Sequence, residues 1–340
     1  MSKKIADLVD DIEKNFFNDV KHPSGIEPID MLLDGGLSYG ITQLVGENQV
    51  GKSTIALQIS YNFCKDGKNV LYINTKGDIT SDDLERMNLL KYREEHSFLL
   101  ICEAAFNKVE DWLDKLIDTG EITLIVIDSI ASLMNAGYLA TGSKAIKSDN
   151  GNSGYNSKPL SLLIKKLAIL SIKKKIVILL INQYKNTIQM YGKNIGTRTK
   201  IGGPKSLMNE SKYVIEIHSI SESNKISKEF KERFLGIESV NKGKSYDFYL
   251  NKGRHPNRSL PYFFEYGKGY SSIYSLIMFS LNEKKIVQNG TYFTLEGKDL
   301  KENGMNDFLK KFRTIFPSSE YYSKYVQKYY SSILDDSDME

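Results

Sequence analysis

Gly46-Glu47-Asn48-Gln49-Val50-Gly51-Lys52-Ser53 is the most informative segment of this chain, and it follows the apolar run Ile41 to Val45. A helical stretch from Thr54 onward comes next. A glycine, four residues and then Gly-Lys-Ser, set between a strand and a helix, is the pattern of a phosphate-binding loop. Its glycines let backbone N–H groups turn toward phosphate oxygens, and the helix adds the positive end of its dipole. A chance match in a glycine turn is the alternative, which the flanking strand and helix disfavour.

We therefore predict that residues 46–54, with Thr54 at their end, hold a nucleoside triphosphate. Lys52 would reach the β- and γ-phosphates, and Ser53 would bind Mg²⁺. The run Leu124 to Ile127 is an apolar strand that ends in Asp128, which would support the same metal ion at the carboxyl edge of a sheet. Gln183 follows another apolar run and would sense the γ-phosphate.

One expected residue is missing from this site. An ATPase needs a carboxylate that activates the attacking water, and in this topology it should follow the strand Asn69 to Ile73. The sequence there reads Asn74-Thr75-Lys76-Gly77-Asp78. Lys76 cannot act as a base while it is protonated, and two residues of extended chain would displace Asp78 by roughly 6.5 Å. Slow or absent hydrolysis is therefore expected.

Length, charge and cysteine content limit the other possibilities. The 340 residues suffice for one large core and a smaller unit, and the net charge of +4 means that any nucleic-acid surface must be local. Cys64 and Cys102 lie in apolar stretches without paired spacing, so we expect two buried thiols and neither a disulfide nor a zinc site. No apolar run approaches the roughly 20 residues that cross a bilayer, which favours a cytoplasmic protein without membrane contact.

Short runs rich in Ile, Val and Leu alternate with helical periods between residues 21 and 266. Such runs are typical of strands covered on both faces, so we predict an α/β fold with a mainly parallel central sheet flanked by helices, of the P-loop ATPase class. The expected strands are Thr42 to Val45, Asn69 to Ile73, Phe98 to Cys102, Leu124 to Ile127, Ile176 to Ile181, Tyr213 to Ile220 and Ser245 to Leu250. The last two would bracket a charged insertion, Ser221 to Lys244.

The chain divides into four predicted zones. Residues 1–20 have apolar side chains at helical spacing and would form an N-terminal helix that packs on its own domain or on a neighbouring subunit. Residues 21–266 would be the ATPase core. Residues 267–330 would form a small α+β C-terminal domain with helices over Ser272 to Leu281 and Asn306 to Phe316, and residues 331–340 an acidic tail.

Two loops have the composition of a single-strand nucleic-acid site. The first, Asn135 to Pro159, is long and rich in Gly, Ser and Asn, and the second, between Tyr184 and Lys205, has no acidic residue. Cations for phosphates combined with aromatic or apolar side chains for bases are the elements of such a site, and an ordinary solvated basic loop is the alternative. The residues expected to contact DNA are Lys144, Lys147, Lys185, Tyr191, Lys193, Arg198, Lys200, Gly202, Gly203 and Lys205.

The order and spacing of several motifs resemble those of the RecA recombinases. These motifs are Gly35-Gly36-Leu37-Ser38-Tyr39-Gly40, the phosphate-binding loop, Ile127-Asp128-Ser129-Ile130-Ala131-Ser132-Leu133, Ile181-Asn182-Gln183 and Tyr266-Gly267-Lys268-Gly269. The resemblance covers nearly the whole chain. Abundant Lys, Ile, Asn and Tyr point to a divergent member, similar to the phage UvsX-like branch of the family.

The resemblance implies an ATP- and Mg²⁺-dependent homo-oligomeric filament on single-stranded DNA, which pairs with homologous duplex DNA and exchanges strands in recombination and repair. It implies a bacterial or phage-infected host cytoplasm, and a single-strand-binding protein or a mediator as a candidate partner. Lys52 and Gln183 would serve ATP hydrolysis and its coupling to DNA, and Lys252 would reach the ATP of the neighbouring subunit.

Three positions depart from the family pattern. The catalytic glutamate falls on Lys76, a second cross-subunit lysine falls on Leu250, and a tyrosine near the adenine falls on Asp83. Two alternatives therefore stay open. One is a degenerate paralogue or mediator that binds ATP and regulates a recombinase with little or no hydrolysis. The other is a ring-forming helicase that shares the core fold.

Overall fold

A computed structural model gives the fold, and it describes residues 20–134, 157–189, 196–220, 243–282, 285–295, 300–303 and 305–315. The predicted N-terminal helix, most of the insertion and the acidic tail lie outside these residues. The four-zone division of the chain stays a prediction.

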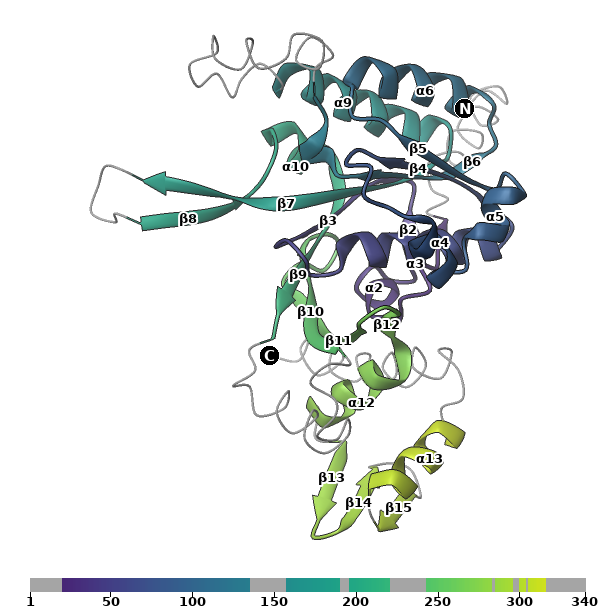
Figure 1. The fold of residues 1–340 in the computed structure, drawn as a ribbon. Helices are drawn as coiled ribbons and strands as arrows, with labels where there is room; N and C mark the ends of the chain where they lie inside the picture. The colour runs from purple at the N-terminus through teal and green to yellow at the C-terminus, as the bar shows by residue number, and fades with distance from the viewer. Residues whose placement is uncertain are drawn as a thin grey trace, which may run out of the picture.

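A ten-stranded mixed sheet forms the centre of the molecule (Figure 1), in the order β12-β11-β10-β9-β3-β7-β6-β4-β5 with β8 paired to β7. The six strands from β9 to β5 are parallel to their neighbours, and the others are antiparallel. This arrangement confirms the predicted α/β class. The strands are β3 (Gly40–Gly46), β4 (Asn69–Asn74), β5 (Phe98–Cys102), β6 (Ile122–Asp128), β7 (Val177–Gln189), β8 (Gly196–Ile201), β9 (Ser211–Ser219), β10 (Gly243–Lys252), β11 (Arg258–Glu265) and β12 (Gly269–Ser271).

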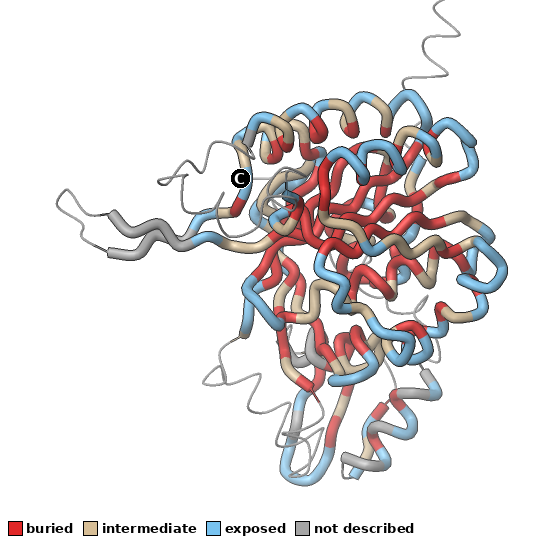
Figure 2. Tube along the Cα trace, turned by 45° about the horizontal axis from the view of Figure 1, so that its top comes forward, coloured by how far each residue is buried: buried red, intermediate tan, exposed pale blue. Residues whose placement is uncertain are grey.

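Helices cover both faces of the parallel part of the sheet. On one face lie α6 (Phe106–Asp118) and α9 (Ser157–Lys173), and on the other lie α2 (Glu27–Leu32), α3 (Lys52–Lys65), α4 (Ser81–Arg86) and α5 (Leu90–Glu94). Each layer buries its own apolar cluster against the strands, and Figure 2 shows the buried residues concentrated between the layers. The continuous apolar runs of the sequence are explained by this two-sided burial. Shorter elements complete the core: β1 (Lys21–His22), β2 (Leu37–Ser38), η1 (Ile130–Ser132) and α10 (Lys205–Glu210).

The C-terminal elements pack below the main sheet in Figure 1. Helices α12 (Ser272–Asn282) and α13 (Met305–Ile315) lie within one residue of their predicted bounds at either end. Between them is a three-stranded antiparallel sheet of β13 (Ile286–Asn289), β14 (Tyr292–Leu295) and β15 (Leu300–Asn303). The sequence did not predict these strands, because runs of four residues give too short a pattern of alternation.

Two predictions about local structure were wrong. The expected loop after Tyr184 begins as a continuation of β7, which runs to Gln189 and pairs with β8 instead of ending at Ile181. The antiparallel partner satisfies the backbone groups there, so the strand needs no apolar side chains. Cys102 is exposed, since it ends β5, the edge strand among the strands that the structure describes.

Thr75 joins the carboxyl ends of β4 and β6, which is the edge that carries the predicted nucleotide site. Its hydroxyl donates to the Ser129 carbonyl (3.0 Å) and accepts from the Ser129 N–H (2.7 Å), and both residues are buried. Its N–H donates to the Asp128 carbonyl at 2.7 Å. These bonds fix the position of Asp128 at the carboxyl end of β6.

Replacing Thr75 by Val should lower the free energy of unfolding by about 1–3 kcal/mol, because the buried Ser129 N–H loses its acceptor. Thr42→Val is the matched control. The Thr42 hydroxyl is buried and has no hydrogen-bond partner among the described residues, so its removal should be neutral or stabilising. Urea unfolding measures both changes, and equal effects of the two substitutions would contradict this role of Thr75.

Candidate functional site

Of the two glycines in the predicted phosphate-binding loop, Gly51 has the positive φ that the sequence predicts and Gly46 does not. Gly51 lies in the left-handed region (φ 83°) and begins α3, and no side chain caps the first turn of this described helix. A Cβ atom on Gly51 would lie 2.5 Å from the Phe264 ring. Glycine is therefore required here for conformation and for packing. The uncapped N–H groups of α3 and its positive dipole end fit a phosphate group.

Lys52 lies folded over this loop. Its ammonium donates to the Gly46 carbonyl at 3.0 Å and to the Glu47 carbonyl. Burial lowers the pKa of Lys52 to about 8; the Asp128 carboxylate opposes this shift, and the Lys76 ammonium adds to it. The structure thus brings Lys52, Asp128 and Lys76 into one electrostatic neighbourhood.

Asp128 ends β6 at the same edge and is 3% exposed. The Tyr72 hydroxyl on the neighbouring strand β4 donates to its Oδ2 at 2.8 Å. Burial, followed by the Asp128 charge, raises the pKa of Tyr72 well above its ordinary value, so this hydroxyl stays a donor. Sequence reasoning missed Tyr72, although its place two residues before the end of β4 could have indicated that it faces this edge.

The segment after β4 does not extend as predicted. Gly77 adopts φ 68° and donates its N–H to the Asn74 Oδ1 at 3.2 Å, which turns the chain. The estimated displacement of Asp78 along an extended chain therefore does not apply. Asp78 is exposed, and its charge is the smallest of the contributions that raise the pKa of Tyr72.

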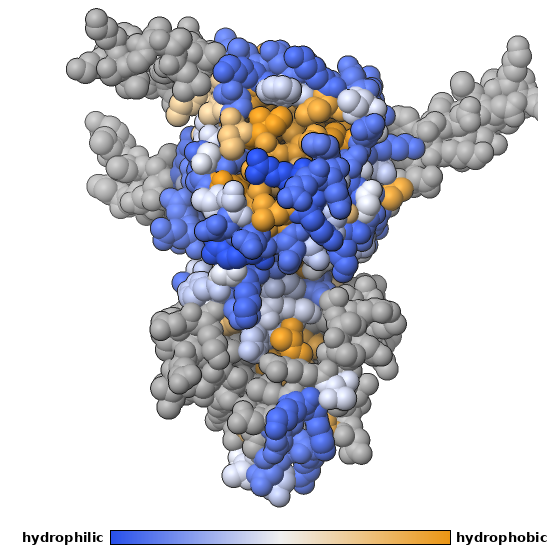
Figure 3. All heavy atoms as spheres, turned by 45° about the vertical axis from the view of Figure 1, so that its right-hand side comes forward, coloured by the Kyte–Doolittle hydropathy of each residue, from blue (hydrophilic) through white to orange (hydrophobic). Residues whose placement is uncertain are grey.

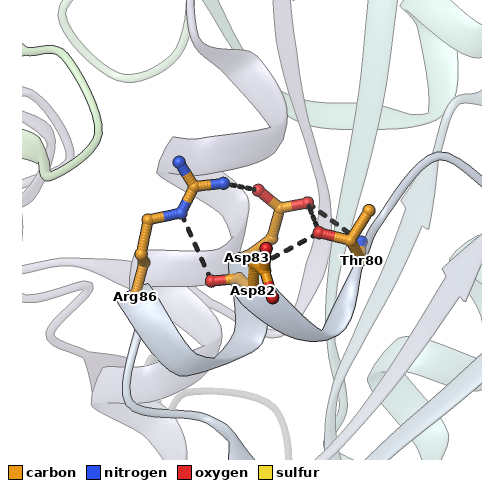
Figure 4. Close-up of polar contacts among 4 residues, drawn as sticks. All are labelled: Thr80, Asp82, Asp83 and Arg86. Carbon is orange, nitrogen blue, oxygen red and sulfur yellow. Dashed lines mark hydrogen bonds and ion pairs between the residues drawn. The ribbon is translucent and has the colours of Figure 1, made fainter.

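Asp83, which occupies the family's adenine-contacting position, is part of a helix cap (Figure 4). Its carboxylate accepts from the N–H (2.9 Å) and hydroxyl (2.7 Å) of Thr80 and pairs with Arg86. Burial acts to raise the pKa of Asp83, but these bonds outweigh it and hold the pKa below its usual range. In this structure Asp83 caps the first turn of α4 together with Thr80, and its carboxylate offers no base-stacking surface.

A buried polar network ties Gln183 to the end of β8. The Gln183 carbonyl accepts from the Gly202 N–H (2.9 Å), and the Asn182 amide donates to the Gly202 carbonyl (2.9 Å) and to Gln43 on β3 (3.1 Å). A Cβ atom on Gly202 would lie 2.8 Å from the Gln183 carbonyl oxygen. Gly202 is buried, so in this structure it is a packing residue. Gly203 is exposed.

The strands β7 and β8 form a hairpin that projects from the sheet (Figure 1), and we call it the basic hairpin. Lys185 and Lys200 are exposed and directly opposite each other across it, and Arg198 lies opposite Thr187. Lys205 is exposed at the start of α10. The other predicted DNA contacts, Lys144, Lys147, Tyr191 and Lys193, lie outside the described residues.

Lys252 lies apart from the phosphate-binding loop of its own chain. Its ammonium donates to the carbonyls of Met208 (2.8 Å) and Asn209 (3.0 Å) near the end of α10. Lys252 pairs with Val214 on β9. Three residues further along β9, Ile217 pairs with Gly46 at the start of the loop. The expected contact of Lys252 with the ATP of a neighbouring subunit stays a prediction.

The edge strand β5 carries a hydrophobic surface. Leu99, Leu100 and Ile101 are half-buried on this strand, which pairs with β4 alone among the described strands. Figure 3 shows apolar atoms gathered on this side of the core. An apolar edge of this kind is a template for another chain. No helix in the described ranges is long and apolar enough to cross a membrane.

Comparisons with known proteins agree with this geometry. The family model of the RecA N-terminal domain matches residues 11–242. A mitochondrial RecA homologue 3 of Arabidopsis thaliana, named a DNA repair protein, is 23% identical over 82% of this chain, which spans 60% of that protein's length. A plasmid RecA protein of Lactococcus lactis is 24% identical over 86% of this chain and 80% of that protein. The DNA repair and recombination protein RadB of Methanobrevibacter smithii is 28% identical over 62% of this chain and 86% of that protein. The chain belongs to the RecA family.

Proposed function

We propose that this chain is an ATP-dependent recombinase that assembles as a filament on single-stranded DNA and pairs it with homologous duplex DNA for strand exchange. One observation carries the proposal. Strand β7, which forms the basic hairpin with β8, pairs with β3, and β3 leads into the phosphate-binding loop. In this pairing Gln183 lies opposite Gly46. A nucleotide bound at the loop therefore lies against the base of the hairpin.

The residues at the loop fit a magnesium–nucleotide complex. Lys52 and the N–H groups of α3 would hold the phosphates, and Ser53 and Asp128 would hold Mg²⁺, which neutralises phosphate charge when it is bound. Tyr72 orients the Asp128 carboxylate for this task. Gln183 is half-buried beside the loop, where it would sense the terminal phosphate.

The charges of the basic hairpin favour a polyanionic partner. Like charges directly opposite each other on paired strands destabilise the pair, as Lys185 and Lys200 do here. No acidic residue between positions 184 and 205 compensates them. A phosphate backbone bound along the hairpin would remove this repulsion, and it would make the affinity depend on salt.

Filament contacts are proposed at two places. The apolar β5 edge would accept a segment of a neighbouring subunit, with the N-terminal residues as the candidate. Lys252 would approach the nucleotide of an adjacent subunit. Electron microscopy of the full chain with single-stranded DNA and a non-hydrolysable ATP analogue tests the assembly: we expect helical filaments, and rings or a lack of DNA binding would contradict the proposal.

A second candidate function is favoured by Lys76. A lysine close to Lys52, at the position where an ATPase of this type has a carboxylate, suits nucleotide binding better than water activation. The chain would then be a mediator that binds ATP and regulates a partner recombinase. Strand exchange by the purified protein alone would eliminate this candidate.

The pKa of Lys52 leads to a prediction about pH. A lysine must be protonated to bind phosphate, so the affinity for ATP should weaken as the pH rises above about 8, by up to about tenfold per pH unit. Isothermal titration calorimetry with the non-hydrolysable analogue measures this trend. Lys52→Ala should bind weakly at every pH, and a constant affinity of the unaltered protein across this range would contradict the prediction.

Lys76→Glu should raise DNA-stimulated ATP turnover by up to about a hundredfold, because it supplies a base at the family's position. Lys76→Gln is the matched control, since it removes the charge without supplying a base and should leave turnover low. A steady-state phosphate-release assay compares them. If Lys76→Glu has no effect, the base lies elsewhere, and Asp78→Asn is the next variant to measure.

Substituting both Lys185 and Lys200 by Ala should weaken binding to single-stranded DNA and flatten its dependence on salt. The slope of log K against log salt should fall in magnitude by about 0.7 for each cation removed. Lys115→Ala with Lys173→Ala, on the exposed surfaces of α6 and α9, is the control pair. An unaltered slope in the hairpin variant would exclude these two lysines from the DNA path.

A further inference from the structure

The hydroxyl of Tyr184 bridges two strands across the start of the phosphate-binding loop. Tyr184 is the first residue of β7 beyond its pairing with β3 and the first that pairs with β8. Its hydroxyl donates to the Oε2 of Glu216 on β9. Because β3 lies between β7 and β9, the two side chains span roughly 10 Å over the point where β3 ends at Gly46.

Glu216 is held firmly enough to serve as the fixed end of this bridge. Glu216 as a residue is 7% exposed, and it pairs with Val45, one position before Gly46. The Asn251 amide on β10 donates to the other carboxylate oxygen, and the His218 Nε2 lies 3.3 Å from Oε2. A buried carboxylate with several donors is costly to disturb, so movement at the bridge is expected on the Tyr184 side.

The nucleotide loop and the bridge also interact through charge. Burial raises the pKa of Tyr184, Glu216 raises it further, and Glu47 of the phosphate-binding loop contributes in the same direction. The hydroxyl therefore remains a donor.

We propose that Tyr184 is a positioning residue whose bond to Glu216 fixes the base of the basic hairpin relative to the phosphate-binding loop, so that bound nucleotide sets the affinity of the hairpin for single-stranded DNA. The inference rests on the proposed function and adds a residue to it. Gln183 and Tyr184 are adjacent in a strand, so their side chains lie on opposite faces of the sheet. The bridge is therefore a contact separate from any that Gln183 makes.

The test uses the full chain and the variant Tyr184→Phe, which removes the hydroxyl and keeps the ring. Fluorescence anisotropy with labelled oligo(dT), with and without a non-hydrolysable ATP analogue, gives two dissociation constants, and we call their ratio the coupling factor. We expect the variant to bind DNA without nucleotide as the unaltered protein does. Its coupling factor should fall by about fivefold or more.

Two further variants separate coupling from structure. Tyr249→Phe is the matched control, because the Tyr249 ring stacks on His218 while its hydroxyl donates to Asn257 (2.6 Å) and takes no part in the bridge. It should leave the coupling factor unchanged. Glu216→Gln combined with Tyr184→Phe should lower the coupling factor no further than the stronger single variant, because both act on one interaction.

Each outcome decides the inference. An unchanged coupling factor in Tyr184→Phe overturns the inference. It is also overturned if Tyr184→Phe weakens DNA binding by the same factor with and without nucleotide, because that result marks a merely structural role. An equal loss in Tyr249→Phe overturns it as well. In these cases the unaltered protein still binds DNA in an ATP-dependent manner, so the proposed function stands. If the unaltered protein shows no such binding, both proposals fall.

Discussion

The parallel pairing of β3 with β7 is the constraint on which the candidate site depends. It aligns Gly46 with Gln183, so the loop that would hold phosphates begins beside the residue at which β7 leaves the sheet. The pairing of β4 with β6 aligns Asn74 with Asp128 at the same edge. Because parallel strands present their carboxyl ends together, four separate segments of the chain supply one site.

Like charges are gathered at both ends of this arrangement. The Lys76 charge acts on Lys52 at the loop, and Lys185 and Lys200 are paired across the hairpin. Neither pair by itself stabilises the protein, because like charges repel. A phosphate-bearing ligand would relieve the repulsion in each pair, which is the electrostatic basis of the proposed link between a nucleotide at one end and a polynucleotide at the other.

Between these two ends the sheet supplies hydrogen-bonded connections. Asn182 and Gly202 join the hairpin to β3 on one side, and Tyr184 reaches Glu216 over β3. Buried polar networks of this kind hold one geometry well when every member is satisfied. The hairpin carries few apolar side chains, so these contacts at its base set the direction in which it projects.

Local sequence patterns were sufficient for the α/β class, for the glycine turn before α3 and for the place of Asp128 at the end of β6, because each depends on a few adjacent residues and on the burial of strands on both faces. The extension of β7 to Gln189 escaped prediction because backbone pairing with β8, and not side-chain hydrophobicity, stabilises it. Contacts such as Tyr72 with Asp128 and Tyr184 with Glu216 join residues that are far apart in the chain. Strand order and register bring them together, and no spacing within a single segment encodes such proximity.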